Sequence, residues 1–347
     1  MTPHKDIFLA DTRPGHYHLA QGVIAALQRL RPVEVTRVAV ERRWIVPTRW
    51  LRRRIASQNF CPPRMLRMAY RIDADALPRA DLVISGGGET LMPNICITRF
   101  LNVPNIYCGS LLRGLGPENF SLVISSYDRD AGSERHLVTL KPSAIDPDAL
   151  GRPASVPRYG PERKPRLAGL LIGGNAGLFR YQRSEWERLL AFVEEVSASW
   201  GTRWLISTSR RTPAPVADRV AKLALNDKVV ARFIDYRTAG PGTLPEIFAA
   251  AEIVVCTEDS STMISEAVSA RLPVVGVAPA AHRFTDEEQA YRAMLVEKGW
   301  CRVLPIAALN PDAFAAALSQ IVPLATNPLD ALAATLQQRL PELFRTG

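Results

Sequence analysis

The stretch EIVVCTEDSSTMISEAVSAR, residues 252–271, joins an apolar run, a short polar turn and an amphipathic segment. The run of residues 253–256 has no polar interruption, which is typical of a strand buried on both faces of a parallel sheet. The small hydroxyl residues that follow the turn favour the start of a helix. The stretch therefore predicts a strand–turn–helix unit of an α/β fold.

The same unit recurs before and after this stretch. LAGLLIGG (167–174) precedes SEWERLLAFVEEVSASWG (184–201), RWLISTS (203–209) precedes PVADRVAKLAL (215–225), and LPVVGVA (272–278) precedes DEEQAYRAMLVEKG (286–299). Short apolar strands that alternate with helices of this length predict βαβ units and a parallel sheet.

A second α/β pattern occupies the first part of the chain. IFLA (7–10), VEVTRVAV (33–40) and DLVISGGG (81–88) suggest strands, and LAQGVIAALQRL (19–30) suggests an amphipathic helix. NIYCGS (105–110), SLVISS (121–126) and HLVTL (136–140) suggest further short strands. Residues 141–166 contain six prolines and no periodicity, as in a linker or an extended hinge.

We therefore expect an α/β protein with two doubly wound, Rossmann-like parallel-sheet domains that face each other across a cleft. The expected ranges are 1–150 for an N-terminal domain, 151–166 for a proline-rich linker and 167–325 for a C-terminal domain. A final helix within 326–347 is expected to pack back on the N-terminal domain. Ligands bind at the carboxyl ends of the strands in such sheets.

Composition narrows the class of protein. The 347 residues are 47% hydrophobic and 22% charged, with no apolar run of the roughly 18–20 residues that a membrane span needs. The only apolar segment near the start is IFLA, which is too short for a secretory signal. Five cysteines without a CxxC pair, and no HExxH motif, give no reason to expect a metal. We expect a cytoplasmic protein.

The positive charge is concentrated in one window. Residues 29–71 hold twelve arginines and two acidic residues, Glu34 and Glu41. The net charge of this window, +10 (12 − 2), exceeds the net charge of +9 of the whole chain. Within this window, residues 42–54 mix arginines with Trp44 and Trp50. This mixture favours an anionic membrane surface or a lipid-linked acceptor, with peripheral attachment to the inner face of a membrane. Nucleic acid, which we do not expect as a partner, and an ordinary solvated face are the alternatives.

Two loops of the N-terminal half are candidates for one side of a site. In ADTRPGHYH (10–18), His16 is expected in a loop between strand and helix, where Gly15 leaves room for the backbone and the imidazole could act as a general base. In SGGGET (85–90), three glycines follow a strand and Glu89 lies near a helix start. The alternatives are an inert exposed histidine and a plain turn. The candidates on this side are Arg13, Gly15, His16, Gly86, Gly87, Gly88 and Glu89.

Three turns of the C-terminal half are candidates for an anion site. The glycines of LLIGGNAG (170–177) could bring backbone N–H groups close to an anion. Ser209 and the arginines of STSRRTP (207–213) could bind a phosphate, although adjacent arginines are also common surface residues. The stretch quoted first offers hydroxyl groups and N–H groups at a helix start, unless Asp259 or Ser260 is simply the N-cap. Glu266, about one turn into the helix, suits a diol better than a phosphate.

Taken together, these segments resemble the mitochondrial fission elongated-mitochondria (ELM) family. The resemblance runs from about residue 6 to 305, and STSRRT and TEDSSTMISEA are its most specific parts. It departs from the family pattern at YCGSLLRGLGPENF (107–120), a region that could determine the acceptor. The family resembles glycosyltransferases of the GT-B fold.

Two of these segments are also similar to the N-acetylglucosaminyltransferase of peptidoglycan lipid synthesis. PGHYHLAQGVIA matches its glycine–histidine loop at Gly15 and His16, and DSSTMISEAVSARLP matches it at Ser265, Glu266, Leu272 and Pro273. This resemblance implies that Glu266 holds the ribose of a nucleotide sugar and that residues 261–263 face its diphosphate.

The resemblance implies a glycosyltransferase that moves a sugar from a nucleotide-diphosphate sugar to a lipid-linked or cell-envelope acceptor, without a metal or a cofactor. A non-catalytic membrane-associated scaffold, or an epimerase or hydrolase of nucleotide sugars with the same fold, is the alternative. His16 is the expected catalytic residue. The expected donor-binding residues are Gly173, Gly174, Asn175, Ser209, Arg210, Asp259, Ser260, Ser261, Thr262, Met263 and Glu266.

Overall fold

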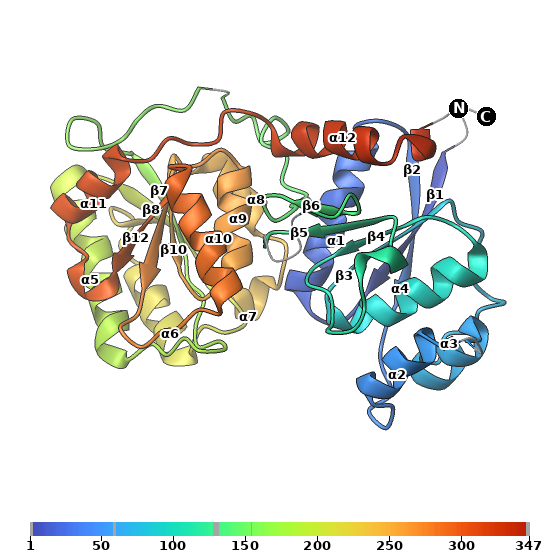
Figure 1. Cartoon of the computed structure of the whole chain (residues 1–347). Helices are drawn as coiled ribbons and strands as arrows, with labels where there is room; N and C mark the ends of the chain where they lie inside the picture. Colours follow the sequence, from blue (N-terminus) through green and yellow to red (C-terminus); the bar gives the residue numbers. More distant parts are fainter. Residues whose placement is uncertain (1–2, 58–59, 128–131, 154, 345–347) are drawn as a thin grey trace. The chain divides into compact units, whose positions relative to one another are not determined.

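A computed structural model describes residues 3–57, 60–127, 132–153 and 155–344. The chain divides into two compact units (Figure 1). Unit 1 comprises Met1–Ala144 and Pro328–Gly347, and unit 2 comprises Ile145–Asn327. No helix in the described ranges is long and apolar enough to cross a membrane.

Unit 1 is built on a six-stranded, all-parallel sheet in the order β2-β1-β3-β4-β5-β6. Its strands are β1 (His4–Ala10), β2 (Val33–Ala39), β3 (Leu82–Gly86), β4 (Asn105–Cys108), β5 (Leu122–Ser125) and β6 (His136–Val138). Its helices are α1 (Pro14–Gln28), α2 (Thr48–Ile55), α3 (Pro62–Tyr70), α4 (Gly88–Leu101) and α12 (Pro328–Arg339).

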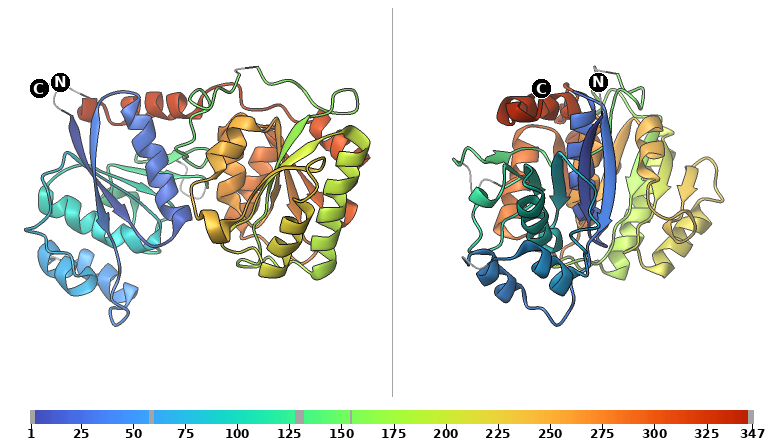
Figure 2. Two further views of the ribbon diagram at one scale, coloured as in Figure 1. Left: turned by 180° about the vertical axis from the view of Figure 1, so that it is seen from behind. Right: turned by 90° about the vertical axis from the view of Figure 1, so that its right-hand side faces the viewer.

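The central strands of unit 1, β1, β3, β4 and β5, are buried on both faces of the sheet. Ile7 and Leu9 lie in a core with α3 and α4, whereas Phe8 and Ala10 point to the opposite face and lie in a core with α1 and α12. This alternation follows from the two-residue period of a strand. Helix α12 packs beside α1 although the two lie at opposite ends of the chain (Figure 2).

Unit 2 holds a second all-parallel sheet, in the order β12-β11-β10-β7-β8-β9. Its strands are β7 (Leu167–Leu171), β8 (Arg203–Ser207), β9 (Val230–Ile234), β10 (Ile253–Thr257), β11 (Val274–Ala278) and β12 (Cys301–Pro305). Its helices are α5 (Arg183–Trp200), α6 (Ala214–Leu223), α7 (Tyr236–Ala239), α8 (Leu244–Ala250), α9 (Ser261–Ser269), α10 (Asp286–Glu297) and α11 (Pro311–Ser319).

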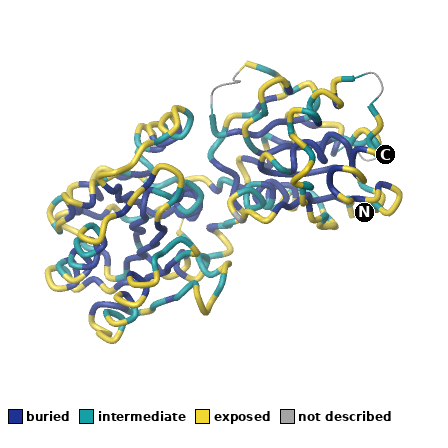
Figure 3. Tube along the Cα trace, turned by 90° about the horizontal axis from the view of Figure 1, so that it is seen from below, coloured by how far each residue is buried: buried dark blue, intermediate teal, exposed yellow. Residues whose placement is uncertain are grey.

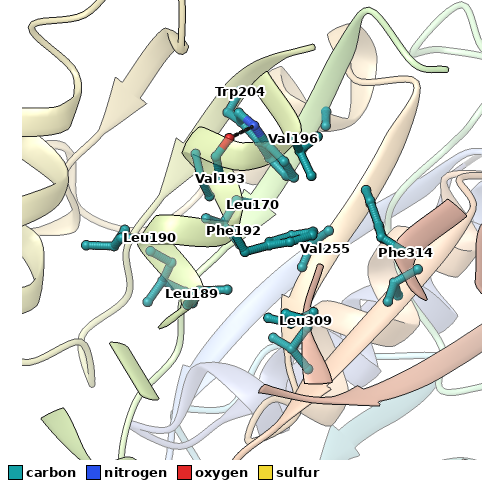
Figure 4. Close-up of a cluster of buried hydrophobic side chains, with 14 of the residues drawn as sticks. Leu170, Leu189, Leu190, Phe192, Val193, Val196, Trp204, Val255, Leu309 and Phe314 are labelled. Carbon is teal, nitrogen blue, oxygen red and sulfur yellow. Dashed lines mark hydrogen bonds between the residues drawn. The ribbon is translucent and has the colours of Figure 1, made fainter. Parts of the chain in front are cut away.

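An aromatic core fixes α5 and α11 on one face of this sheet (Figure 4). Phe192, Trp204 and Phe314 are fully buried, and the Trp204 indole N–H donates to the Val193 carbonyl at 3.2 Å. In both units, long stretches of the chain are buried and shorter exposed segments lie between them (Figure 3).

Each sheet has one point at which the strand order reverses. In unit 1 the chain passes from β1 to β2 on one side and to β3 on the other, and in unit 2 it passes from β7 to β8 on one side and to β10 on the other. Ligands of doubly wound sheets bind outside the carboxyl ends of the strands at this reversal. The residues after β1 and β3, and those after β7 and β10, are therefore the positions where the fold favours a site.

The two doubly wound parallel sheets expected from the sequence are confirmed, with some corrections of detail. Helix α1 begins at Pro14, so His16 lies in the first helical turn rather than in the expected loop. A proline suits this position because its fixed φ matches a helix and its missing N–H would have no helical partner. The chain passes from unit 1 to unit 2 after Ala144. Asp148 already belongs to unit 2, where it pairs with Arg271 at 2.7 Å.

Candidate functional site

His16 and Asp11 form a hydrogen-bonded pair at the strand reversal of unit 1. Asp11 directly follows β1, and its Oδ2 lies 2.6 Å from Nδ1 of His16. The other oxygen, Oδ1, accepts the Arg13 backbone N–H at 3.0 Å. The Asp11 side chain is 4% exposed and that of His16 is 30% exposed. A carboxylate at Nδ1 keeps the proton of a neutral imidazole there, which leaves Nε2 with the lone pair that a general base needs.

Glycines after β3 make room for this histidine. A Cβ atom on Gly87 would lie 2.3 Å from the His16 ring, and one on Gly86 would lie 2.4 Å from the His16 carbonyl oxygen. Gly87 also has a φ of +87°, which L side chains rarely adopt. Two of the three glycines that the sequence singled out, Gly86 and Gly87, therefore lie against His16 and bring the end of β3 into contact with the start of α1.

His16 lines a pocket with a volume of about 150 Å³. Gly88 and Glu89 of α4 line it as well, and Arg42 Nε donates to Glu89 Oε2 at 3.0 Å. The pocket mixes charged and apolar groups, which is the composition of many ligand sites. Its lining comprises Arg13, His16, Arg42, Thr48, Tyr70, Gly88, Glu89, Met92 and Leu112.

In unit 2, Asp259 joins the loops that follow three strands. Its Oδ2 accepts hydrogen bonds from Arg211 at 2.7 Å and from the Gly174 N–H at 3.1 Å, while its Oδ1 accepts from the Tyr181 hydroxyl at 3.2 Å. The Asp259 side chain is fully buried. Burial, with the Asp259 charge as a second cause, raises the pKa of Tyr181, so this hydroxyl remains a donor. The carboxylate thus links the loops at the ends of β7, β8 and β10 by hydrogen bonds.

This network corrects the expected role of the glycine turn. The Gly173 N–H donates to Thr257 Oγ1 at 2.7 Å, and the Gly174 N–H donates to Asp259. A Cβ atom on Gly173 would lie 2.2 Å from the Asp259 carboxylate, and one on Gly174 would lie 2.0 Å from the Arg211 carbonyl oxygen. Both N–H groups are used within the protein, and the glycines permit close packing of the loops.

Glu258 has a separate partner beneath the turn. Its Oε2 lies 2.8 Å from Arg292 Nε, and the Arg292 guanidinium also donates to the Glu258 carbonyl at 3.1 Å. Glu258 is fully buried and the Arg292 side chain is 7% exposed. Burial raises the pKa of Glu258, and the charge of Arg292 opposes this shift. The two acids of the turn therefore face two different arginines and neither needs a ligand.

Helix α9 begins directly after this turn. Ser260 is its N-cap, and the Ser260 hydroxyl accepts the Met263 N–H at 3.4 Å. Ser261 and Thr262 are half-buried residues of the first turn, and Glu266 is 8% exposed further along the helix. Below them, the Ser265 hydroxyl lies 2.7 Å from the Tyr291 hydroxyl. The helix therefore presents its positive end beside the strand reversal, which favours an anion.

The two arginines of the loop after β8 differ in their surroundings. Arg210 is exposed, and Arg211 makes the pair with Asp259. The Ser209 hydroxyl accepts the Arg211 N–H at 3.1 Å, so it shapes the loop. Asn175 likewise serves the backbone, because its Oδ1 accepts the Tyr181 N–H at 2.8 Å.

Asp11, Tyr181 and Arg292 were not identified as candidates from the sequence, and Arg211 was considered only as one of the two arginines of STSRRTP that could bind a phosphate. Asp11 had a usable signal, because it is an acidic residue directly after a strand and five residues before the histidine. Arg292 had none, since an arginine in a polar helix gives no sign that it will be buried. In the part of the chain that the structure describes, no group of three or more His, Cys, Asp or Glu side chains could hold a metal ion.

Comparisons with solved structures agree with this fold. A putative UDP-N-acetylglucosamine 2-epimerase from Listeria monocytogenes is 14% identical, with a TM-score of 0.56 and 98% of each chain covered. MnaA of S. aureus, solved with UDP, is 13% identical, with a TM-score of 0.51 and coverage of 99% of this chain and 98% of that one. MurG of Acinetobacter baumannii is 13% identical, with a TM-score of 0.50 and coverage of 97% and 100%.

The fold is therefore that of the GT-B proteins, which this chain shares with glycosyltransferases and with UDP-N-acetylglucosamine 2-epimerases. No curated protein sequence matches the chain. The model of the family described as mitochondrial fission ELM1 matches residues 14–340. With nearly the whole chain matched, this protein belongs to the mitochondrial fission ELM1 family.

Proposed function

We propose that the protein is a glycosyltransferase that takes a sugar from a nucleotide-diphosphate sugar and attaches it to a lipid-linked or cell-envelope acceptor. The observation that carries this proposal is the His16–Asp11 pair, which is placed beside a pocket at the strand reversal of unit 1. A second reversal, in unit 2, carries a helix N-terminus suited to a diphosphate. Support also comes from the GT-B fold.

The donor is assigned to unit 2. The first turn of α9, at Ser261, Thr262 and Met263, would face the diphosphate, and Glu266 would accept hydrogen bonds from the ribose hydroxyls. Asp259 would not contact the anion, because a carboxylate is repelled by a phosphate. It would instead hold the start of α9 in place through its hydrogen bonds from Arg211 and from the Gly174 N–H.

The acceptor is assigned to the pocket of unit 1. His16 Nε2 would take the proton of an acceptor hydroxyl while the hydroxyl oxygen forms its bond to the anomeric carbon of the sugar. The bond from that carbon to the diphosphate breaks, and the nucleoside diphosphate leaves with the electron pair. Asp11 would stabilise the imidazolium that forms, because its carboxylate is 2.6 Å from Nδ1.

An epimerase or hydrolase of nucleotide sugars is the second candidate, because the Listeria monocytogenes protein named as a 2-epimerase has the same fold. The two activities differ in one requirement, since an epimerase or hydrolase acts on the nucleotide sugar without an acceptor. A non-catalytic scaffold would show neither activity.

The test is an assay of nucleoside diphosphate release from a panel of nucleotide sugars, with and without a lipid extract as acceptor. The proposal predicts release only when the acceptor is present, with the sugar recovered in the lipid fraction. An altered or free sugar without acceptor would assign the protein to the second candidate. If no nucleotide sugar is turned over or bound, the non-catalytic scaffold is the remaining alternative.

A further inference from the structure

Helices α2 and α3 of unit 1 carry a positively charged surface. Residues 41–71 contain nine arginines and a single acidic residue, Glu41. We name the exposed arginines of this segment, together with its exposed large apolar residues, the arginine face. They are Trp44, Ile45, Arg49, Arg53, Arg54, Arg64, Arg67, Met68 and Arg71.

The arginine face is built on a firmly packed base. On α2, Leu51 and Ile55 are buried in the core of unit 1, and on α3 Met65 and Leu66 are buried in the same core. Arg49 and Arg53 lie four residues apart and thus on the same side of α2, away from these anchors. The two helices lie at the periphery of the unit, below α4 in Figure 1. Their charge is therefore presented outward by a fixed scaffold.

Large apolar side chains are exposed within this charged surface. Trp44 is 90% exposed and Ile45 is 58% exposed, both in the loop between β2 and α2. Such exposure of adjacent apolar side chains is unfavourable in water unless a partner covers them. Trp is enriched where a protein meets the boundary between membrane and water.

A shallow cavity of about 110 Å³ adds a mixed binding surface between the two helices. Trp50, Phe60 and Met68 supply apolar walls, and Arg54 and Arg64 supply charge. The Arg54 guanidinium lies 5.3 Å from the centre of the Trp50 ring. Apolar walls beside cationic groups match an amphiphile with an anionic headgroup, whereas a nucleic acid needs mainly phosphate and base contacts.

We propose that the arginine face docks the protein on the surface of an anionic lipid bilayer, with Trp44 and Ile45 inserted among the lipids. The arginines meet the phosphate groups and the two apolar side chains supply the part of the binding that salt does not screen. Arg42, Thr48 and Tyr70 of the same segment line the His16 pocket. Resting on the proposed function, this placement would bring a membrane-anchored acceptor to the pocket.

The test measures sedimentation of the full chain with vesicles of phosphatidylglycerol and phosphatidylcholine, compared with vesicles of phosphatidylcholine alone. Binding to the anionic vesicles is expected, with little binding to the neutral ones. The triple variant Arg49→Gln/Arg53→Gln/Arg64→Gln should weaken binding by about tenfold or more. Each arginine near an anionic surface increases the affinity by about fivefold. Trp44→Ser/Ile45→Ser should leave only weak, electrostatic binding. Salt at 0.5 M should remove this remaining binding, because it shortens the screening length to roughly 4 Å.

Matched variants in unit 2 control for charge and hydrophobicity. Arg158→Gln/Arg166→Gln/Arg183→Gln removes three exposed arginines, and Leu225→Ser/Val322→Ser removes two exposed apolar side chains, so both should bind like wild type. Equal binding to neutral and anionic vesicles, equal losses in test and control variants, or a preference for a short RNA would overturn the proposal. Nucleotide-sugar binding is measured separately without vesicles, so failure of docking and failure of the proposed function are distinguishable.

Discussion

Nδ1 of His16 and Oδ2 of Asp11 lie 2.6 Å apart, and this contact links the first turn of α1 to the carboxyl end of β1. The contact orients the imidazole and leaves Nε2 available for a hydrogen bond to a substrate. If His16 is the base of a glycosyl transfer, its removal must affect turnover more than donor binding.

His16→Ala should lower kcat by about 10²–10⁴-fold, the range that general bases contribute, with unchanged binding of the nucleotide sugar. Asp11→Asn should lower kcat as well, because an amide at this position no longer stabilises an imidazolium. Steady-state kinetics and calorimetry of the same samples test both. His18→Ala, two residues further along α1, is the control, and turnover that falls equally in this variant would remove His16 from the mechanism.

A neighbouring glycine offers a sharper test of how His16 is placed. Gly87→Ala puts a Cβ atom 2.3 Å from the His16 ring. We expect Gly87→Ala to lower kcat by about 10²-fold, because a displacement of roughly 1 Å can cost that much. The control is Gly201→Ala at the end of α5, where φ is also positive (+68°) and nothing lies within 4 Å of a Cβ atom; it should retain turnover within a few-fold. Similar rates for the two variants would show that the contact has no catalytic consequence.

Asp259 should matter for stability as well as for the donor site. Asp259→Ala leaves Arg211, Tyr181 and the Gly174 N–H without their shared acceptor. We expect a loss of about 2–3 kcal/mol in the free energy of unfolding of unit 2, below the 3–5 kcal/mol of a fully buried pair because Arg211 is partly exposed. Glu187→Ala, which breaks the exposed pairs with Arg183 and Arg219, should change it much less, because solvent screens exposed ion pairs. Urea unfolding compares them, and equal losses would contradict the internal role of Asp259.

Two carboxyl groups should respond to pH with opposite signs. Burial raises the pKa of Asp6 although His4 and Arg31 oppose the shift, so the folded protein binds the proton more tightly than the unfolded chain. The stability that Asp6 contributes is therefore present at low pH and is lost as the pH rises through the raised pKa. The melting temperature of Asp6→Asn relative to wild type should increase from pH 4 to pH 7.

Asp235 provides the opposite case. Hydrogen bonds from Arg237 lower the pKa of Asp235, so its contribution is present at neutral pH and is lost as the pH falls through the unfolded value and then the folded one. The melting temperature of Asp235→Asn relative to wild type should therefore decrease from pH 3 to pH 5, because the ordinary pKa of 3.8 lies within this window and the lowered folded pKa lies below 3.8. The same trend in both variants would contradict one of the two assignments.

In unit 2, the sequence predicted the central strands better than the edge strands, whereas both edge strands of unit 1, β2 and β6, were expected. β10 and β11 are fully buried and appear as uninterrupted apolar runs, which is why their units were recognised. β9 and β12 lie at the two edges of their sheet, where only some side chains are buried. Their weaker patterns, VARFI and CRVLP, did not separate them from loops.

The candidate site was predicted by position but only partly by residue. The segments after β1, β3, β7 and β10 follow from parallel strands, whose carboxyl ends share one edge of a sheet. Which of two adjacent residues faces inward depends on loop conformation, and this is why Arg210 was chosen where Arg211 makes the contact with Asp259. The partner of Glu258 could not be predicted, because Arg292 comes from a helix 34 residues later.

The most direct test of the account is a thermal-shift measurement with a panel of nucleotide-diphosphate sugars on wild type and Glu266→Ala. At a hundredfold excess over the Kd, the account predicts that at least one sugar nucleotide stabilises the wild type by about 2.7 kcal/mol, and that Glu266→Ala loses most of this gain, measured from its own melting temperature without ligand. No stabilisation of the wild type by any member of the panel, or an equal gain in the variant, would contradict the assignment of a nucleotide sugar to α9.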